Sequence, residues 1–219
     1  MSHTDVHNKA ARLIASVMGA LGGLGAMVHG VGEVLQGDTT ASSIFIQSWA
    51  QGPIATYMDG DPAITLISNM LISGCLVLIF SFVTIIYAGV YIRYNRDGLV
   101  LIFLAIIMLL VGGGVGPPVL TLLAGLAGLG INAAYAWWRS HVSGHILAIL
   151  AAAWPWIFAV CVLNGIFLLV GHVIAAYFFA PVASNIFLNS FFFGVLTIIA
   201  SIISGIAYDI SRAAVAAPL

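Results

Sequence analysis

The sequence predicts an all-α integral membrane protein, a bundle of six transmembrane helices with both termini in the cytoplasm. Hydrophobic residues make up 62% of its 219 residues and charged residues only 6%, whereas a typical soluble domain has about 25% charged residues. The apolar residues form long runs of the kind that cross about 30 Å of hydrocarbon. All six Lys and Arg then fall on one side of the membrane, as cations in short cytoplasmic loops do.

The apolar runs define the expected elements of one membrane domain, residues 1–219. We expect the spans at residues 11–35, 64–92, 99–111, 117–138, 156–179 and 186–208. Residues 36–63 are the only sizeable hydrophilic segment, and their aromatic and aliphatic residues predict a structured outer loop. Pro155 lies between two tryptophans, which favours a helix start at the headgroup region. We therefore expect a separate, short interfacial helix at the cytoplasmic face, over residues 143–153.

The charges set the orientation and the location. The cytoplasmic side receives Lys9, Arg12, Arg93, Arg96, Arg139 and Arg212. The outer side receives Asp38, Asp59 and Asp61 and no cation. This distribution predicts a multi-pass protein of the cell membrane with the lipid bilayer as its main partner. The net charge of −1 argues against nucleic acid as a partner, because phosphate binding needs clustered Lys and Arg.

The first span carries a face of small residues that becomes polar toward the outside. Its members recur at three- and four-residue steps: Gly19, Gly22, Gly23, Ala26, His29, Gly30 and Glu33. His172 of the fifth span is expected at the depth of His29, because it lies about 24 Å along its helix from Trp156. Ionisable groups within spans often mark a site. His29, Glu33 and His172 are therefore a candidate site for a ligand, a metal or a proton.

Two alternatives remain open for these three residues. His29 and Glu33 are one turn apart and would simply hydrogen-bond to each other at the membrane boundary. A single buried histidine such as His172 is also common as a hydrogen-bonded core residue. If the three converge, haem or a metal ion is the cofactor that such side chains take.

A break rich in glycine and proline separates the third and fourth spans. Its members are Gly112, Gly113, Gly114, Gly116 and Pro117, which do not continue a helix. Backbone of this kind within a membrane must be shielded by protein or line a wet cavity, so these residues are a candidate backbone cavity at the start of the fourth helix. The alternative is a tight turn at the outer surface.

The sixth span carries hydroxyl groups along one face. The candidate polar path comprises Ser190, Thr197, Ser201 and Ser204. The alternative is that these hydroxyls join neighbouring helices by hydrogen bonds.

These features favour transport or handling of a small molecule through an outward-facing polar site. One alternative is a non-catalytic subunit of a larger complex, which would bind a partner protein or a second copy through the glycine-rich helix faces or the outer loop. Another is a redox anchor that binds haem, a metal or a quinone. The sequence contains no HExxH motif or recognised nucleophile pattern, so we predict no catalytic residue.

Overall fold

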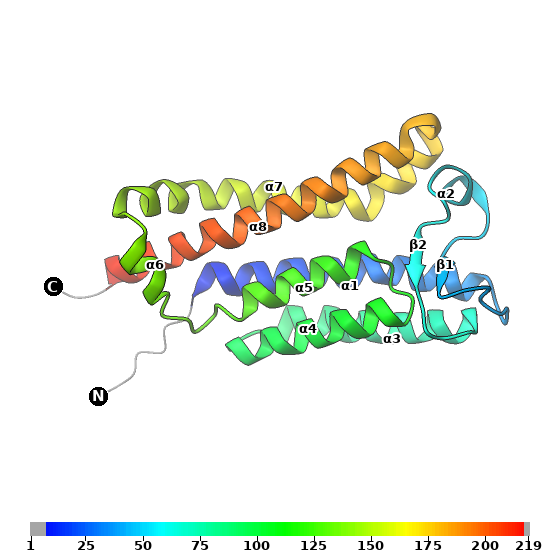
Figure 1. Cartoon of the computed structure of the whole chain (residues 1–219), viewed down its shortest axis with the longest axis horizontal. Helices are drawn as coiled ribbons and strands as arrows, with labels where there is room; N and C mark the ends of the chain where they lie inside the picture. Colours follow the sequence, from blue (N-terminus) through cyan, green and yellow to red (C-terminus); the bar gives the residue numbers. More distant parts are fainter. Residues whose placement is uncertain (1–7, 217–219) are drawn as a thin grey trace.

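The computed structural model describes residues 8–216, and nearly all of its elements are helices (Figure 1). The helices are α1 (Lys9–Leu35), α2 (Gly52–Tyr57), α3 (Met70–Ile86), α4 (Asn95–Leu110), α5 (Gly116–Gly128), α6 (Ala136–His141), α7 (Gly144–Phe178) and α8 (Ala183–Ala216). The π-helical turn η1 (Tyr87–Tyr91) prolongs α3, and the 3-10 turn η2 (Ala180–Val182) joins α7 to α8. Strand β1 (Phe45–Gln47) pairs antiparallel with β2 (Pro62–Ile64). The all-α expectation is confirmed.

Four of these helices are long and apolar enough to cross a membrane, which supports the expected membrane protein. They are α1, α3 together with η1, α7 and α8. Helices α4 and α5 are shorter. They have 16 and 13 residues, which is about 24 and 20 Å at 1.5 Å per residue.

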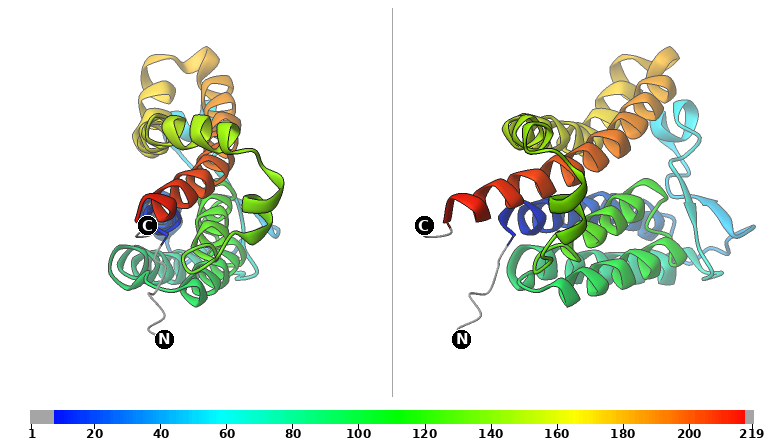
Figure 2. Two further views of the ribbon diagram at one scale, coloured as in Figure 1. Left: turned by 90° about the vertical axis from the view of Figure 1, so that its left-hand side faces the viewer. Right: turned by 60° about the vertical axis from the view of Figure 1, so that its left-hand side comes forward.

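Helix α1 lies between two groups of helices. Helices α3, α4 and α5 lie on one side of it, and α7 and α8 form an antiparallel hairpin on the other (Figures 1 and 2). We call α1, α3, α4 and α5 the four-helix unit, and α7 with α8 the hairpin. The hairpin helices pack mainly against each other and make smaller contacts with α1. Both ends of the described chain lie at one end of the bundle, and β1, β2 and α2 lie at the other.

Small residues let α1 pack closely against its neighbours. All seven residues of its predicted inward face are buried. A Cβ added to Gly30 would lie 2.9 Å from Val77 Cγ1, and one on Gly74 of α3 would lie 2.7 Å from the Gly30 carbonyl oxygen. The glycine face of α1 is thus covered by helices of the same chain, which is the packing that small residues favour in membranes.

The start of α1 is held by polar side chains from distant parts of the chain. The Asp209 carboxylate of α8 accepts the N–H groups of Ala10 at 2.9 Å and Ala11 at 3.1 Å. Asn8 donates from its side chain to the Gly130 carbonyl at 2.6 Å. The Asp209 contacts satisfy helix N–H groups that have no partner within the helix, and they place a carboxylate at its positive end.

The structure corrects the expected break at Pro155. Helix α7 continues through Pro155 from Gly144, so residues 143–153 are not a separate interfacial helix. Proline removes one helical hydrogen bond, and packed membrane helices tolerate that loss. Trp154 fixes this part of the helix, because its ring packs 4.4 Å from the ring of Tyr208 in α8.

The ends of other helices also differ from expectation. The helix expected over residues 117–138 ends at Gly128, and the short α6 follows after a turn. The Gly130 carbonyl accepts hydrogen bonds from Asn8 and from the Tyr135 hydroxyl, which hold this turn. The helix expected over 64–92 begins only at Met70, after β2, and the one expected over 99–111 begins earlier, at Asn95.

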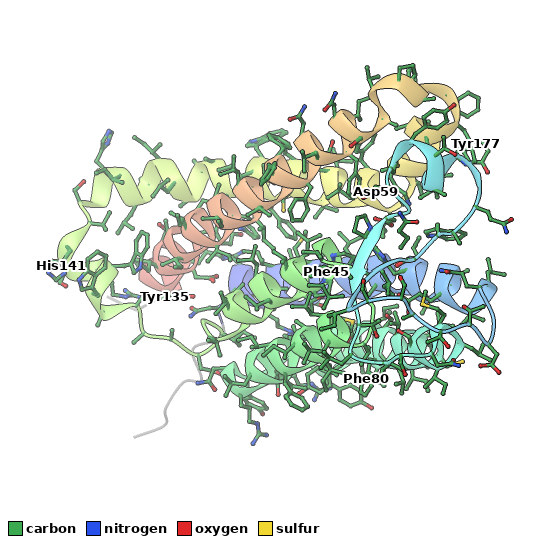
Figure 3. The ribbon with its side chains drawn as sticks, turned by 45° about the vertical axis from the view of Figure 1, so that its right-hand side comes forward. Phe45, Asp59, Phe80, Tyr135, His141 and Tyr177 are labelled. Carbon is green, nitrogen blue, oxygen red and sulfur yellow. The ribbon has the colours of Figure 1, made fainter. Side chains whose placement is uncertain are left out.

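The segment between α1 and α3, residues 36–69, is folded onto the helices; we call it the loop segment. Ile46 and Ala63 are buried against Met70 of α3. Ile54 and Met58 pack on the far end of α7. Figure 3 shows Phe45 and Asp59 of this segment well separated from Tyr135 and His141.

Candidate functional site

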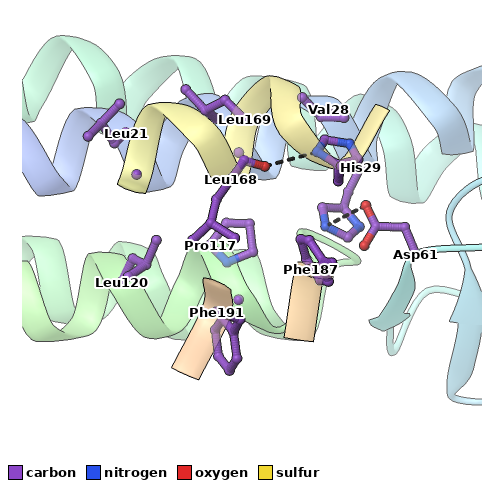
Figure 4. Close-up of a pocket in the computed structure, with 14 residues that line it drawn as sticks. Leu21, Val28, His29, Asp61, Pro117, Leu120, Leu168, Leu169, Phe187 and Phe191 are labelled. Carbon is purple, nitrogen blue, oxygen red and sulfur yellow. Dashed lines mark hydrogen bonds and ion pairs between the residues drawn. The ribbon is translucent and has the colours of Figure 1, made fainter. Parts of the chain in front are cut away.

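A small cavity lies where the hairpin meets the four-helix unit (Figure 4). Its lining is apolar apart from His29 of α1, Asp61 of the loop segment and His172 of α7, the three polar side chains among the described residues that line it. Its volume is about 40 Å³, well below the roughly 300 Å³ at which typical small-molecule sites begin. The cavity has room for a few water molecules, with polar groups that can bind them.

His29 connects the cavity to a buried polar cluster. Its ring is only 5% exposed. The Nε2 atom lies 3.4 Å from Asp61 Oδ2, and Nδ1 lies 2.9 Å from the hydroxyl oxygen of Ser48. Both ring nitrogens therefore have a polar partner, and both partners come from the loop segment.

Glu33 lies behind His29 and is 0% exposed. Its Oε1 accepts a hydrogen bond from the Ser48 hydroxyl at 3.3 Å, and its Oε2 has no hydrogen-bond partner among the described residues. Ser48 therefore bridges Glu33 and His29. The sequence-based alternative, a direct hydrogen bond between His29 and Glu33, does not occur; the serine lies between them.

The glycine break folds over this polar cluster. Gly112 has φ +110° and Gly114 has φ +76°, a region that favours glycine. A Cβ on Gly112 would lie 2.5 Å from Glu33 Oε2, and one on Gly114 would overlap the His29 ring. Gly113 instead turns toward α4, where its N–H donates to the Met108 carbonyl.

The first turn of α5 completes one wall of the cavity. Gly116 and Pro117 both line it. Pro117 and Pro118 have no N–H group, and the Val119 N–H donates to the Val115 carbonyl.

His172 presents a free nitrogen in the same cavity. Its Nδ1–H donates to the Leu168 carbonyl at 2.9 Å. This bond fixes the neutral ring with its lone pair on Nε2. That Nε2 is buried without a partner among the described residues, and the Phe187 ring stands edge-on to the imidazole at 6.0 Å. His29 and His172 thus share the cavity, whereas Glu33 does not line it.

The site offers single ligands for haem or a metal ion, the cofactors considered from the sequence, but no complete set of ligands among the described residues. Among residues 8–216, no group of three or more His, Cys, Asp or Glu side chains is arranged to hold a metal ion. His172 Nε2 is the nitrogen best prepared to bind a metal or haem iron, because Nδ1–H is already engaged. With a volume of about 40 Å³, the cavity is too small for a porphyrin. Of two other histidine pairs with a four-residue spacing, His3 and His7 lie outside the described residues, and His141 and His145 belong to different helices.

The hydroxyls of α8 do not line the cavity. Thr197 and Ser204 donate to carbonyls of their own helix. Ser201 is buried without a partner among the described residues, and Ser190 accepts through its backbone carbonyl from the Asn164 side chain at 2.9 Å. The last contact joins α8 to α7 through a backbone carbonyl, and not through a hydroxyl as the alternative of interhelical hydrogen bonds expected.

Sequence reasoning missed Ser48 and Asp61 as site residues. Asp61 adopts a left-handed conformation with φ +56°, directly before Pro62, and proline disfavours the α conformation in the preceding residue. The Ser48 N–H donates to the Asp61 carbonyl, so the two residues are held next to each other. An Asp-Gly-Asp-Pro turn in an otherwise apolar loop was the available signal.

No protein-family model, no curated protein and no solved structure matches this chain. The functional argument therefore depends on the geometry of the site alone.

Proposed function

We propose that this chain is a small membrane transport protein that binds its solute at the cavity shared by His29 and His172. The proposal rests mainly on that cavity. Its lining is mainly apolar, and its polar side chains are buried and converge from three separate parts of the chain. Buried polar groups are costly to keep in a membrane, and they commonly mark a pathway or a site.

The proposed topology has six spans with both termini in the cytoplasm. We propose that α4 and α5 complete the six spans and that, at about 24 and 20 Å, they cross a locally thinned part of the bilayer. The start of α1, the start of α4 and the end of α8 lie at one end of the bundle (Figure 1). The cations of the chain are in or next to these segments and α6, which supports a cytoplasmic location for that end.

The division into two packed groups gives the cavity a way to open. Its walls come from α1 and α5 of the four-helix unit and from α7 and α8 of the hairpin. The hairpin makes its main contacts within itself, so it can move relative to α1 without losing its own packing. Rocking of one helix group against another around a fixed site is a general mode of membrane transport.

The chemistry of the cavity defines the solute class. The lining carries one carboxylate and two imidazoles among apolar side chains. The His172 Nε2 lone pair accepts a hydrogen bond from a donor group. We therefore expect a small, neutral or cationic molecule with at least one N–H or O–H group.

Thermal unfolding in detergent with a panel of small amines, alcohols and amides tests this proposal. A solute at 100 times its Kd stabilises the native protein by about 2.7 kcal/mol. We expect such a solute to raise the melting temperature of the wild type and of His141→Ala, and to leave His172→Leu unchanged. His141 is exposed and lies on α6, at the other end of the bundle (Figure 3). Equal shifts in all three proteins would contradict a site at His172.

A second candidate function, membrane subunit of a larger complex, is favoured by a different observation. The loop segment exposes large apolar side chains: Phe45 is 73% exposed and Leu66 is 62% exposed. Exposed apolar side chains mark a protein-binding site where they form one contiguous patch, and this candidate function requires Phe45 and Leu66 to belong to such a patch. If this function holds, Phe45→Ser removes a stoichiometric partner from the purified protein and leaves the solute-dependent melting shift intact. The same partner bound to Phe45→Ser would contradict it.

A further inference from the structure

The contacts around His29 form a continuous chain of groups that can exchange protons. From the cavity inward, the order is Asp61, His29, Ser48 and Glu33. The three contacts measure 3.4 Å, 2.9 Å and 3.3 Å. All four side chains are buried. Only Asp61 and His29 line the cavity.

We propose that these four side chains form a proton relay, which carries a proton between the cavity and the buried carboxyl of Glu33. The inference rests on the proposed transport function and names the proton as the coupled ion. It depends on the position of Ser48, whose single hydroxyl faces a ring nitrogen on one side and a carboxylate oxygen on the other.

The relay has two states with the same number of protons. In the first, His29 is an imidazolium: Nε2–H points to Asp61, Nδ1–H donates to Ser48, and the Ser48 hydroxyl donates to the Glu33 carboxylate. In the second, the Glu33 hydroxyl donates to Ser48, and Ser48 donates to the unprotonated Nδ1 of His29. Both hydrogen bonds of Ser48 are kept in the two states with their direction reversed, and the Nε2–H of His29 points to Asp61 in both.

Two proton transfers convert one state into the other. The Nδ1–H bond of His29 breaks while an O–H bond forms on Ser48, and the original Ser48 O–H bond breaks while one forms on Glu33 Oε1. No electron is gained or lost, and total charge is unchanged. Uptake from the cavity comes before these transfers: a hydrated proton protonates the free Nε2 of a neutral His29 that carries its hydrogen on Nδ1, which gives the first state and releases a water molecule. The two transfers then leave His29 neutral with hydrogen on Nε2, so that one proton has moved from the cavity to Glu33.

Few other titratable groups lie near the four side chains of the relay. The titratable neighbours of His29 are Glu33 on its own helix, Asp61 from the loop segment and His172 across the cavity. Helix α5 has no titratable residue, Cys75 of α3 is exposed, and the charged residues of α4 and α8 lie at the opposite end of the bundle. Beyond Glu33, the Ser73 hydroxyl donates to the Val111 carbonyl at 2.6 Å, so this serine is engaged with the glycine break.

Hydrogen–deuterium exchange of the Glu33 carboxyl, followed by infrared spectroscopy, tests the relay directly. The purified full-length protein is transferred to D₂O, and the C=O stretch of its protonated carboxyl is followed as the proton is replaced. We expect a band that is lost in Glu33→Gln and that shifts rapidly in the wild type. Ser48→Ala keeps both acids and His29 but interrupts the chain, and it should slow the shift at least about tenfold, the effect of a barrier higher by about 1.4 kcal/mol.

Three further variants keep the result unambiguous. Ser204→Ala removes a buried hydroxyl that bonds only within α8 and should exchange at the wild-type rate. Ser48→Thr retains the hydroxyl and should restore fast exchange. If Ser48→Ala does not fold, His29→Gln interrupts the next link and should slow exchange in the same way.

Two results would overturn the relay: no Glu33 band at any pH, or wild-type exchange in folded Ser48→Ala or His29→Gln. Both concern proton movement only. The solute-dependent melting shift can persist in either case, so failure of the relay is distinguishable from failure of the transport site.

Discussion

Replacing Gly112 with alanine tests the contact between the glycine break and the buried acid. At φ +110°, an L-residue costs about 1–3 kcal/mol. The new Cβ would also lie 2.5 Å from Glu33 Oε2, 2.6 Å from Oε1 and 2.7 Å from the Ser73 hydroxyl oxygen. Overpacking of this kind costs about 1–3 kcal/mol. We therefore expect Gly112→Ala to lower the free energy of unfolding by about 2–6 kcal/mol.

Gly37 provides the matched control. It also has positive φ, +71°, but a Cβ there meets no atom within 4 Å. Gly37→Ala should cost about 1–2 kcal/mol from backbone conformation alone. Thermal unfolding in mild detergent measures both variants, with about 2–4 °C per kcal/mol in a chain of this size. If Gly112→Ala is no less stable than Gly37→Ala, the break does not pack against Glu33.

Two further predictions concern the anchoring of α1 and the topology. Asp209→Ala should destabilise the protein by about 1.5–3 kcal/mol, because it removes the charged acceptor of two N–H groups at the start of α1. A loss below about 0.5 kcal/mol, the range of ordinary surface substitutions, would show that the cap is unimportant. Reporter fusions should place both the N-terminus and the C-terminus in the cytoplasm, and an external C-terminus would contradict the six-span topology.

The helical periodicity of the sequence was sufficient to predict which faces turn inward. Spacing alone placed His29 and Glu33 on the buried side of α1, and it placed His172 on the same face of α7 as Cys161 and Gly165, both buried. A helix has a fixed rotation per residue, so once the axis is known the inward side follows. The four hydroxyl residues expected on one face of the sixth span do not share one environment, because Ser201 and Ser204 are buried whereas Ser190 and Thr197 are only partly buried.

The partners of those faces were not predictable in the same way. Ser48 and Asp61 reach His29 because the loop segment folds back over the end of α1, and no periodicity relates a loop residue to a helix. Proline gave a misleading signal at Pro155, where Trp154 packs against Tyr208 and α7 continues. Local rules describe what the backbone prefers, and packing between distant segments decided both outcomes.

A double-mutant cycle between His29 and His172 tests most directly whether the two histidines share one cavity. The free energies of unfolding of His29→Ala, His172→Ala and the double variant are measured, with His29→Ala/His141→Ala as the reference pair. Residues around a shared cavity couple by about 0.5–3 kcal/mol, whereas distant residues are additive within about 0.5 kcal/mol. We predict coupling for His29 and His172 and additivity for His29 and His141. Additivity in both cycles would contradict the shared cavity and the transport site built on it.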